Sequence, residues 1–418
     1  MDEDFEYLLE RIKDSVGIAT GCTEPAAIAL NCAVARKHAP GRIARVDITM
    51  DMGLLKNAMF VGIPGVSGRG IKRCAALGIT AGNPDNGMNV LGGLHAEHEA
   101  EAEALLPLIS VSPKEDINEL YIETIITTDQ GAGRVITYGK HDHIALVERP
   151  PFGDFIPAQD IAAGRIKKFS LARIKQFADT VDIGEIAFLK EGVGINRKIA
   201  ERGMEMGFGK SLSLLNKNAL WGDSIVPYVQ TLTGAASFAR MSGVSLPVMI
   251  ATGSGNQGIT LFLTVAAAAE KLGTAEDRLL RGLALALGVN LLAKAYLGTL
   301  APICACGVAS GLGAAVGIVY ILGGTVPQMM GAVRNMIGGI TGMICDGAKE
   351  GCANKVSLSA AYATLSAMTA VSDFSISPED GILARDIHDV FENMEYLSKT
   401  GMKNTNQAIL RIMTNRSA

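Results

Sequence analysis

The chain has 418 residues, of which 48% are hydrophobic and only 5% aromatic, and its 48 glycines favour closely packed helices. Its formal net charge is −4 and it has no block of lysine or arginine, so nothing in it attracts a nucleic-acid backbone or an anionic membrane surface. This charge pattern leaves a small molecule as the expected ligand. A chain of this length is expected to form two or three domains.

The N-terminal part predicts a helix, a glycine-rich loop and then a second helix. Residues 3–15 are acidic and amphipathic, whereas a signal peptide needs a basic start and an apolar run, so we predict a cytoplasmic protein. The loop GIATGCTEP (17–25) leads into the second helix, where Pro25 suits the first turn. Segments rich in β-branched residues then predict strands at 44–51, 119–129, 133–140 and 143–149.

Helical patterns broken by glycine dominate from about residue 165 to the end. We therefore predict an α+β fold in which a mainly α-helical catalytic domain is formed by residues 1–42 and 150–418. A smaller α+β domain is inserted at 43–149, and RPPFGDFIP (149–157) is typical of its exit linker. The strands of the inserted domain offer an edge for pairing, so we expect a homodimer.

One long apolar stretch raises a membrane transporter as an alternative. Residues 302–334 carry no charge before Arg334, and this stretch is long enough to cross a bilayer. It is interrupted by glycines and by Pro327, however, and other helical segments such as 171–207 are amphipathic. We therefore expect a protein that does not act in a membrane.

Seven cysteines, an odd number in a chain without an export signal, argue against a disulfide framework. Cys32 and Cys74 lie in apolar helical patterns and are expected to be buried thiols. Four of the others fall in two C-terminal motifs, APICACG with Cys304 and Cys306, and ICDGAKEGC with Cys345 and Cys352.

The second of these motifs is built so that its two cysteines can meet. On an unbroken helix, Cys345 and Cys352 would lie about 10.5 Å apart along the axis. Gly347 and Gly351 interrupt the segment between them and allow it to fold back. Both sulfurs can then reach one centre.

Cysteines without nearby histidines point to an iron-sulfur cluster more than to zinc. Structural zinc sites usually show CxxC pairs and four ligands, and no CxxC pair occurs here. Three thiolates on four irons leave one iron open, and an open iron can act as a Lewis acid. A zinc-stabilised binding module without catalysis is the alternative.

Four separated segments carry a family resemblance: TGCTEPAAIAL (20–30), TGSGNQGI (252–259), PICACGVASGLGAAVGIVY (302–320) and GMICDGAKEGCANKVSLSAA (342–361). Together they resemble the L-cysteine desulfidase family. More distantly they are similar to the α chain of iron-sulfur L-serine dehydratases.

This resemblance implies a [4Fe-4S] cluster with one iron not ligated by protein, and no pyridoxal phosphate. The implied ligands are Cys306, Cys345 and Cys352, with Cys304 as the alternative to Cys306. The implied reaction converts L-cysteine to hydrogen sulfide, pyruvate and ammonia. Dehydration of L-serine by the same kind of cluster is the closest rival.

The resemblance also implies a reactive cysteine at Cys22. Its loop precedes a helix, and a helix N-terminus lowers the pKa of a thiol, so Cys22 is a candidate general base; a transient cluster ligand is the alternative. Glu24 is a second catalytic candidate, which would orient the substrate ammonium. The TGSGNQG loop offers backbone N–H groups to a carboxylate. The substrate-binding candidates are Thr23, Ser254, Asn256, Gln257 and Lys355.

Overall fold

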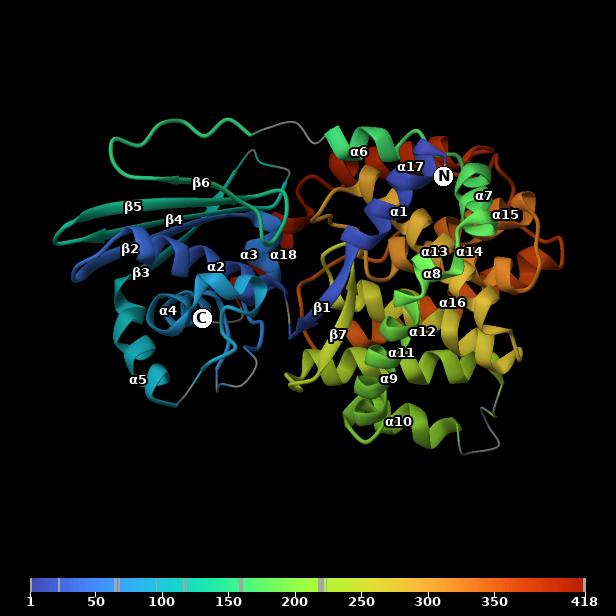
Figure 1. Ribbon diagram of the computed structural model, residues 1–418, viewed down its shortest axis with the longest axis horizontal. Coiled ribbons are helices and arrows are strands. Elements are labelled where there is room, and N and C mark those ends of the chain that lie inside the picture. The colour runs from blue at the N-terminus through green and yellow to red at the C-terminus, as the bar shows by residue number, and fades with distance from the viewer. Residues whose placement is uncertain are drawn as a thin grey trace. The chain divides into compact units, whose positions relative to one another are not determined.

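The computed structural model describes residues 2–21, 23–63, 66, 68–94, 96–115, 117, 119–157, 161–216, 222 and 224–415. Within these residues the chain is α+β and mainly helical, as predicted (Figure 1). It divides into two compact units. The first, called the helical unit, comprises Met1–Ile18, Asp160–Cys345 and Glu350–Lys403. The second, called the sheet unit, comprises Ala19–Gln159, Asp346–Lys349 and Asn404–Ala418.

These units differ from the domain boundaries that we expected. Residues 19–42 cluster with the sheet unit rather than with the helices, because α2 (Thr23–His38) packs on α4 (Ile71–Ala81) and on the sheet. The short segment Asp346–Lys349 also belongs to the sheet unit. The sheet unit is therefore assembled from three separate stretches of chain.

The helical unit contains one short two-stranded sheet and most of the helices. Its elements are α1 (Glu3–Ser15), the first residues of β1 (Val16–Thr20), α6 (Ile161–Ile166), α7 (Leu171–Thr180), α8 (Ile183–Ile186), α9 (Phe188–Gly203), α10 (Gly207–Asn216), α11 (Ile225–Met241), β7 (Pro247–Ala251), α12 (Gly255–Lys271), α13 (Glu276–Leu297), α14 (Val308–Ile321), α15 (Val326–Ile340), α16 (Cys352–Val371), α17 (Ile387–Tyr396) and a π-helical turn (Leu397–Gly401).

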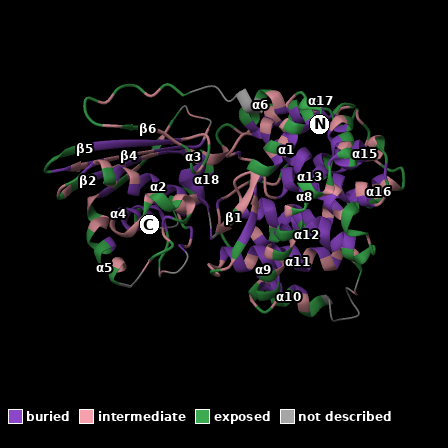
Figure 2. Cartoon of the chain, viewed as in Figure 1, coloured by how far each residue is buried: buried purple, intermediate pink, exposed green. Residues whose placement is uncertain are grey.

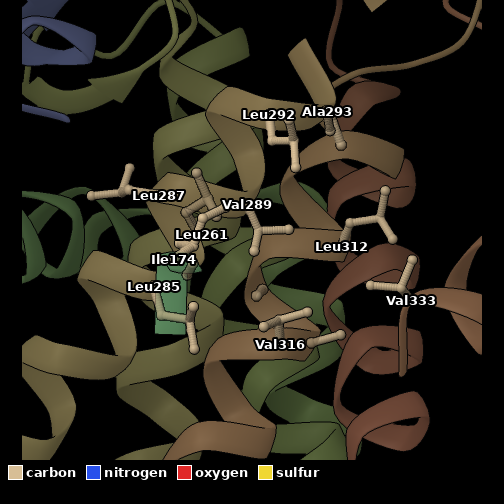
Figure 3. Packing of buried hydrophobic residues seen from close by; sticks show 14 of the residues in the cluster. Ile174, Leu261, Leu285, Leu287, Val289, Leu292, Ala293, Leu312, Val316 and Val333 are labelled. Carbon is tan, nitrogen blue, oxygen red and sulfur yellow. The ribbon is translucent and has the colours of Figure 1, made fainter. Parts of the chain in front are cut away.

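Aliphatic side chains from several helices form the core of this unit. Leu285 and Val289 of α13 lie among Leu261 of α12, Leu312 of α14 and Val333 of α15 (Figure 3), and all five are fully buried. Burial of each such side chain contributes roughly 1.5–3 kcal/mol. Figure 2 shows that much of α13, in the middle of the unit, is buried.

The apolar stretch at 302–334 does not form one long helix. It contains a loop, α14 and the first part of α15, and α14 ends before Gly323, whose φ of 84° is left-handed. In the part of the chain that the structure describes, one helix, α13, is long and apolar enough to cross a membrane by length and composition. Of its most apolar window, 72% is buried inside the protein.

The sheet unit is a five-stranded mixed sheet with helices against it. The strand order is β3-β2-β4-β5-β6, in which β2 runs parallel to β3 and the other neighbours are antiparallel. Its elements are α2, β2 (Ile43–Asp51), α3 (Met52–Ala58), α4, a 3-10 helix (Pro84–Asn89), α5 (Ala96–Leu105), a 3-10 turn (Leu106–Leu108), β3 (Ile109–Lys114), β4 (Tyr121–Thr128), β5 (Gly131–Tyr138), β6 (Ile144–Glu148) and α18 (Thr405–Asn415).

The four predicted strands are present, each within a few residues of its expected bounds. Strand β3 was not predicted, because its sequence ISVSPK contains Pro113 and lacks clear apolar alternation. Its position explains this composition, since an edge strand pairs on one side only and tolerates a proline. β1 and β7 were also missed, since neither VGIAT nor PVMIA alternates apolar and polar residues.

Helices cover one face of the sheet, and the predicted linker covers part of the other. On one face, Asn31 of α2 donates from Nδ2 to the Thr137 hydroxyl (2.9 Å), and Cys32 lies beside Thr124. On the other face, the predicted linker lies along the sheet, and the Phe155 ring packs against Tyr121 and Tyr138. Cys32 and Cys74 are fully buried, which confirms the prediction made for both thiols.

We expect the stability of the sheet unit to depend on the protonation of Asp51. Its carboxylate caps α3 and accepts hydrogen bonds from the amides of Leu54 and Tyr121 (both 2.9 Å), and burial raises its pKa to about 6. Because the unfolded pKa is about 3.9, the folded state binds this proton more tightly. Ionised Asp51 therefore costs stability at pH 7, and this cost is relieved as the pH falls from about 6 to about 4.

The variant Asp51→Asn keeps a capping oxygen and removes the titration. Relative to this variant, the wild-type protein should gain ~2 kcal/mol of unfolding free energy between pH 7 and pH 4, because the unfolded carboxyl is itself partly protonated at pH 4. Urea unfolding followed by circular dichroism at several pH values measures the difference. Parallel pH profiles for the two proteins would contradict this expectation.

Candidate functional site

Backbone pairing brings the two C-terminal cysteine motifs together. The amide of Cys304 donates to the carbonyl of Met343 (2.8 Å), and the amide of Cys345 donates to the carbonyl of Pro302 (2.7 Å). The residues between these pairs form an antiparallel bridge. Two segments that are about forty positions apart in the sequence therefore lie side by side.

Three helices of the helical unit start at this place. Cys352 is the first residue of α16, Cys306 lies two residues before α14, and Ser254 is the N-cap of α12. The Ser254 hydroxyl lies 3.4 Å from the Cys306 sulfur, and α12, α14 and α16 pack on one another. Helix N-termini carry partial positive charge, so this arrangement favours a bound anion.

All four C-terminal cysteines share one electrostatic environment. A hydrogen bond with Cys306, together with burial, raises the pKa of the Cys304 thiol well above its ordinary value, and the nearby Cys345 and Cys352 add to the shift. Cys304 is buried, with 6% of its surface exposed, whereas the other three are partly exposed. The partly exposed thiols are the ones that an approaching ligand can reach.

The gathered side chains fit an iron-sulfur cluster, because they are all cysteines and thiolates are the usual ligands of such a cluster. Among the described residues, no group of three or more His, Cys, Asp or Glu side chains could hold one metal ion. A [4Fe-4S] cluster binds each thiolate through a different iron, so its cysteines stand farther apart than the ligands of one ion. The sequence places one histidine in the helical unit, His388, and it hydrogen-bonds the Tyr296 hydroxyl (3.0 Å).

The TGSGNQG loop connects β7 to α12 through two left-handed residues, Thr252 and Gly253. Its amide side chains point into the protein. Asn256 accepts a hydrogen bond from Arg240 (3.2 Å), and Gln257 accepts one from the Thr252 hydroxyl (2.8 Å). Both amides thus stabilise the loop through hydrogen bonds inside the protein, while the Ser254 hydroxyl contacts the Cys306 sulfur.

Lys355 lies one turn after Cys352 on α16. Its Nζ donates to the carbonyl of Ile344 (2.9 Å), the residue before Cys345. Lys355 therefore holds the two segments of the ICDGAKEGC motif together. Thr260 of α12 acts similarly on the other motif, because its hydroxyl donates to the carbonyl of Cys306 (3.0 Å).

The remaining candidates belong to the sheet unit, and Cys22 lies outside the described residues. Thr23 and Glu24 are the first two residues of α2, and the Thr23 hydroxyl donates to Glu24 Oε2 (3.3 Å). Asn57 Nδ2 donates to Glu24 Oε1 (3.3 Å). The amide of Ala348, between the two cysteines of the second motif, donates to the carbonyl of Asn57 (3.4 Å).

Sequence patterns did not reveal Arg240, Thr260 or Asn57. Each is one polar residue among several in its helix, and a polar residue in a helix is usually exposed. For Arg240, its place at the end of the apolar run TLTGAASFA was the one available signal. A charged residue in an otherwise apolar helix is often buried with a partner.

Comparison with known proteins identifies the family. The model of the serine dehydratase alpha chain family matches residues 85–411. The chain belongs to the serine dehydratase alpha chain family. This finding confirms the predicted relation to iron-sulfur serine dehydratase α chains. The matched range contains TGSGNQG and both C-terminal cysteine motifs of this family member.

Several curated relatives are similar over nearly their whole length. A UPF0597 protein of Clostridium tetani (strain Massachusetts / E88) is 35% identical over 98% of both chains. A UPF0597 protein of Aeromonas hydrophila is 37% identical over 98% of this chain and 95% of its own. A third, from Parabacteroides distasonis, is 34% identical over 98% of both. The full-length similarity includes the Cys22 region, which the family match does not reach.

Proposed function

We propose that the protein is an iron-sulfur lyase that converts L-cysteine to hydrogen sulfide, pyruvate and ammonia without pyridoxal phosphate. The gathering of four cysteines at the N-termini of α12, α14 and α16 is the observation that supports this proposal most strongly. Membership in the serine dehydratase alpha chain family supports a lyase that acts on a small amino acid.

Cys306, Cys345 and Cys352 are the proposed ligands of a [4Fe-4S] cluster. When bound, such a cluster supplies a Lewis-acidic iron that can polarise the leaving group on the β-carbon of the substrate. We prefer Cys306 to Cys304 because Cys306 is partly exposed and lies beside Ser254, whereas Cys304 is buried. Cys304 remains the alternative ligand.

Other residues of the chain bind the substrate and move its proton. We assign the carboxylate to the N-terminal amides of α12, with the Ser254 hydroxyl, and to Lys355. We assign the ammonium to Glu24, with Thr23 beside it, and we assign removal of the α-proton to Cys22. Asn256 and Gln257 then act by holding the loop.

The proposed reaction balances without an oxidant or a reductant. Removal of the α-proton and cleavage of the Cβ–S bond, whose electron pair leaves with sulfur, give 2-aminoacrylate and hydrogen sulfide. 2-Aminoacrylate takes up one water and yields pyruvate and ammonia. The same steps on L-serine would release water instead, which makes L-serine dehydratase the second candidate function, favoured by the name of the family.

Substrate titration separates these two candidates. We expect anaerobically reconstituted enzyme to release pyruvate from L-cysteine at least about tenfold faster than from L-serine, because a thiolate is a softer iron ligand than a hydroxyl. L-Cysteine should also perturb the iron-sulfur absorption and the EPR of the reduced form more than L-serine does. D-Cysteine serves as the control for stereochemistry. Equal spectral responses with faster turnover of serine would assign the protein as a serine dehydratase.

The variant Cys22→Ala tests the proposed base. We expect it to keep the cluster and to lose about 10²- to 10⁴-fold in elimination rate, as is typical when a general base is removed. Iron content, absorption and the rate of pyruvate release measure both properties. Cys32→Ala is the matched control, because burial raises the pKa of the Cys32 thiol to about 12 and makes it inert. Loss of the chromophore in Cys22→Ala would identify Cys22 as a cluster ligand instead.

We further propose a cytoplasmic location and a homodimer. A cluster with an open iron needs a reducing compartment. Strands β3 and β6 are the outer strands of the sheet, and either offers an edge for pairing with a second copy. Light scattering of the purified protein tests the dimer.

A further inference from the structure

Arg240 is a buried cation next to the start of α12. It lies in the last turn of α11 with 4% of its surface exposed. Its Nη1 donates to Asn256 Oδ1 (3.2 Å), and a Cβ added at Gly255 would lie 2.3 Å from its Nε. The guanidinium therefore packs directly against the first residues of α12.

The surroundings of Arg240 set the orientation of the loop. Asn256 Nδ2 faces the Met241 sulfur (3.2 Å), so the amide turns its oxygen towards the guanidinium. Only glycine at position 255 allows this close approach. Ser254 comes immediately before, and its hydroxyl contacts the sulfur of Cys306 (3.4 Å). A chain of direct contacts thus leads from the buried charge to the cysteine site.

A positive charge at this position adds to the field of α12. The N-terminus of a helix already attracts an anion, and a charge held in a poorly hydrated interior is weakly screened. The charge also lies in the last turn of α11, whose carbonyl end favours a cation. The field of this charge is therefore less screened by water than that of an exposed side chain.

We propose that Arg240 is a positioning residue that holds the Ser254–Asn256 turn and supplies buried positive charge, so that the site binds the carboxylate of the amino-acid substrate. This inference rests on the proposed function. If Arg240 acts through its charge, its loss should weaken the binding of a carboxylate but not the binding of an ammonium. A purely structural role would affect both.

Two substrate fragments test this distinction in the holoenzyme. 3-Mercaptopropionate carries the thiol and the carboxylate, and cysteamine carries the thiol and the ammonium. Each is titrated into anaerobic wild-type and variant protein, and its affinity is measured from the change in iron-sulfur absorption. The variant Asn256→Asp keeps the size of the side chain and its Oδ1 acceptor but opposes the charge of Arg240.

We expect Asn256→Asp to bind 3-mercaptopropionate about 10- to 100-fold more weakly and cysteamine within about threefold of the wild type. With L-cysteine, the variant should show a raised KM and a much smaller change in kcat. Arg240→Gln, which removes the charge itself, should show the same selective loss. Arg240→Lys, which keeps the charge, should stay within about threefold for both fragments.

Arg334→Gln is the matched control. Arg334 lies on α15 and donates hydrogen bonds to Ser375 and to the carbonyl of Ile376. These two residues follow the C-terminus of α16, whereas Cys352 is at its N-terminus. Arg334→Gln should leave both affinities unchanged. Equal weakening of both fragments in Asn256→Asp and Arg240→Gln, or no weakening in either, overturns the role of Arg240. A wild-type cluster that responds to neither fragment overturns the proposed function itself, and this inference with it.

Discussion

Replacing Cys345 or Cys352 with serine should abolish the stable [4Fe-4S] species and all elimination activity. Each is one of only three proposed protein ligands, and a serine hydroxyl is a much poorer ligand for iron than a thiolate. Both variants should keep the fold of the helical unit, since neither side chain belongs to its buried core. Iron and labile sulfide per chain, absorption and EPR measure the loss.

The other cysteines provide matched controls for the same substitution. Cys32→Ser and Cys74→Ser change fully buried thiols of the sheet unit and should keep the cluster. Cys306→Ser should lose the cluster, whereas Cys304→Ser should retain it, and the reverse result would exchange the roles of these two residues. An intact cluster in both Cys345→Ser and Cys352→Ser would show that the two cysteines are not ligands.

The variant Gly258→Ala should destabilise the helical unit by about 3 kcal/mol and strongly reduce activity. Gly258 lies in the first turn of α12, where a Cβ would stand 1.9 Å from the carbonyl oxygen of Met249 in β7. That neighbour is backbone, so no rotamer change relieves the clash and α12 must move away from β7. The same movement would separate Ser254 from Cys306.

Gly194→Ala is the control for a glycine in a helix. Gly194 lies in α9, and a Cβ there would meet nothing within 4 Å. This substitution should stabilise the protein by about 0.5–1 kcal/mol, because alanine has less conformational freedom than glycine in the unfolded chain. Thermal unfolding and iron content compare the two variants. Similar stabilities for Gly194→Ala and Gly258→Ala would mean that α12 can move away from β7 at little cost in free energy.

Local patterns were sufficient to predict most of the fold. The strands β2, β4, β5 and β6 and the long helical part follow from residue types repeated at the periods of strands and helices. Short or edge elements such as β1, β3 and β7 lack that repetition. The placement of α2 on the sheet could not be predicted, because the apolar residues of this helix are not gathered on one face that would indicate its partner.

The sequence by itself determined the chemical inventory of the site: cysteine-only donors, glycines that interrupt the helices around them, and the motifs of the family. These depend on residue identity and on short spacings. Only the tertiary structure decided that residues 302–304 pair with 343–345, that Asn256 and Gln257 face inward, and that Arg240 packs against Gly255. The physical reason is that each of these contacts joins segments whose separation in sequence carries no periodic signal. Their geometry is set by how α11, α12, α14 and α16 pack on one another. Helices rich in small residues have several similar surfaces, and which of these surfaces make contact depends on the packing of the complete core.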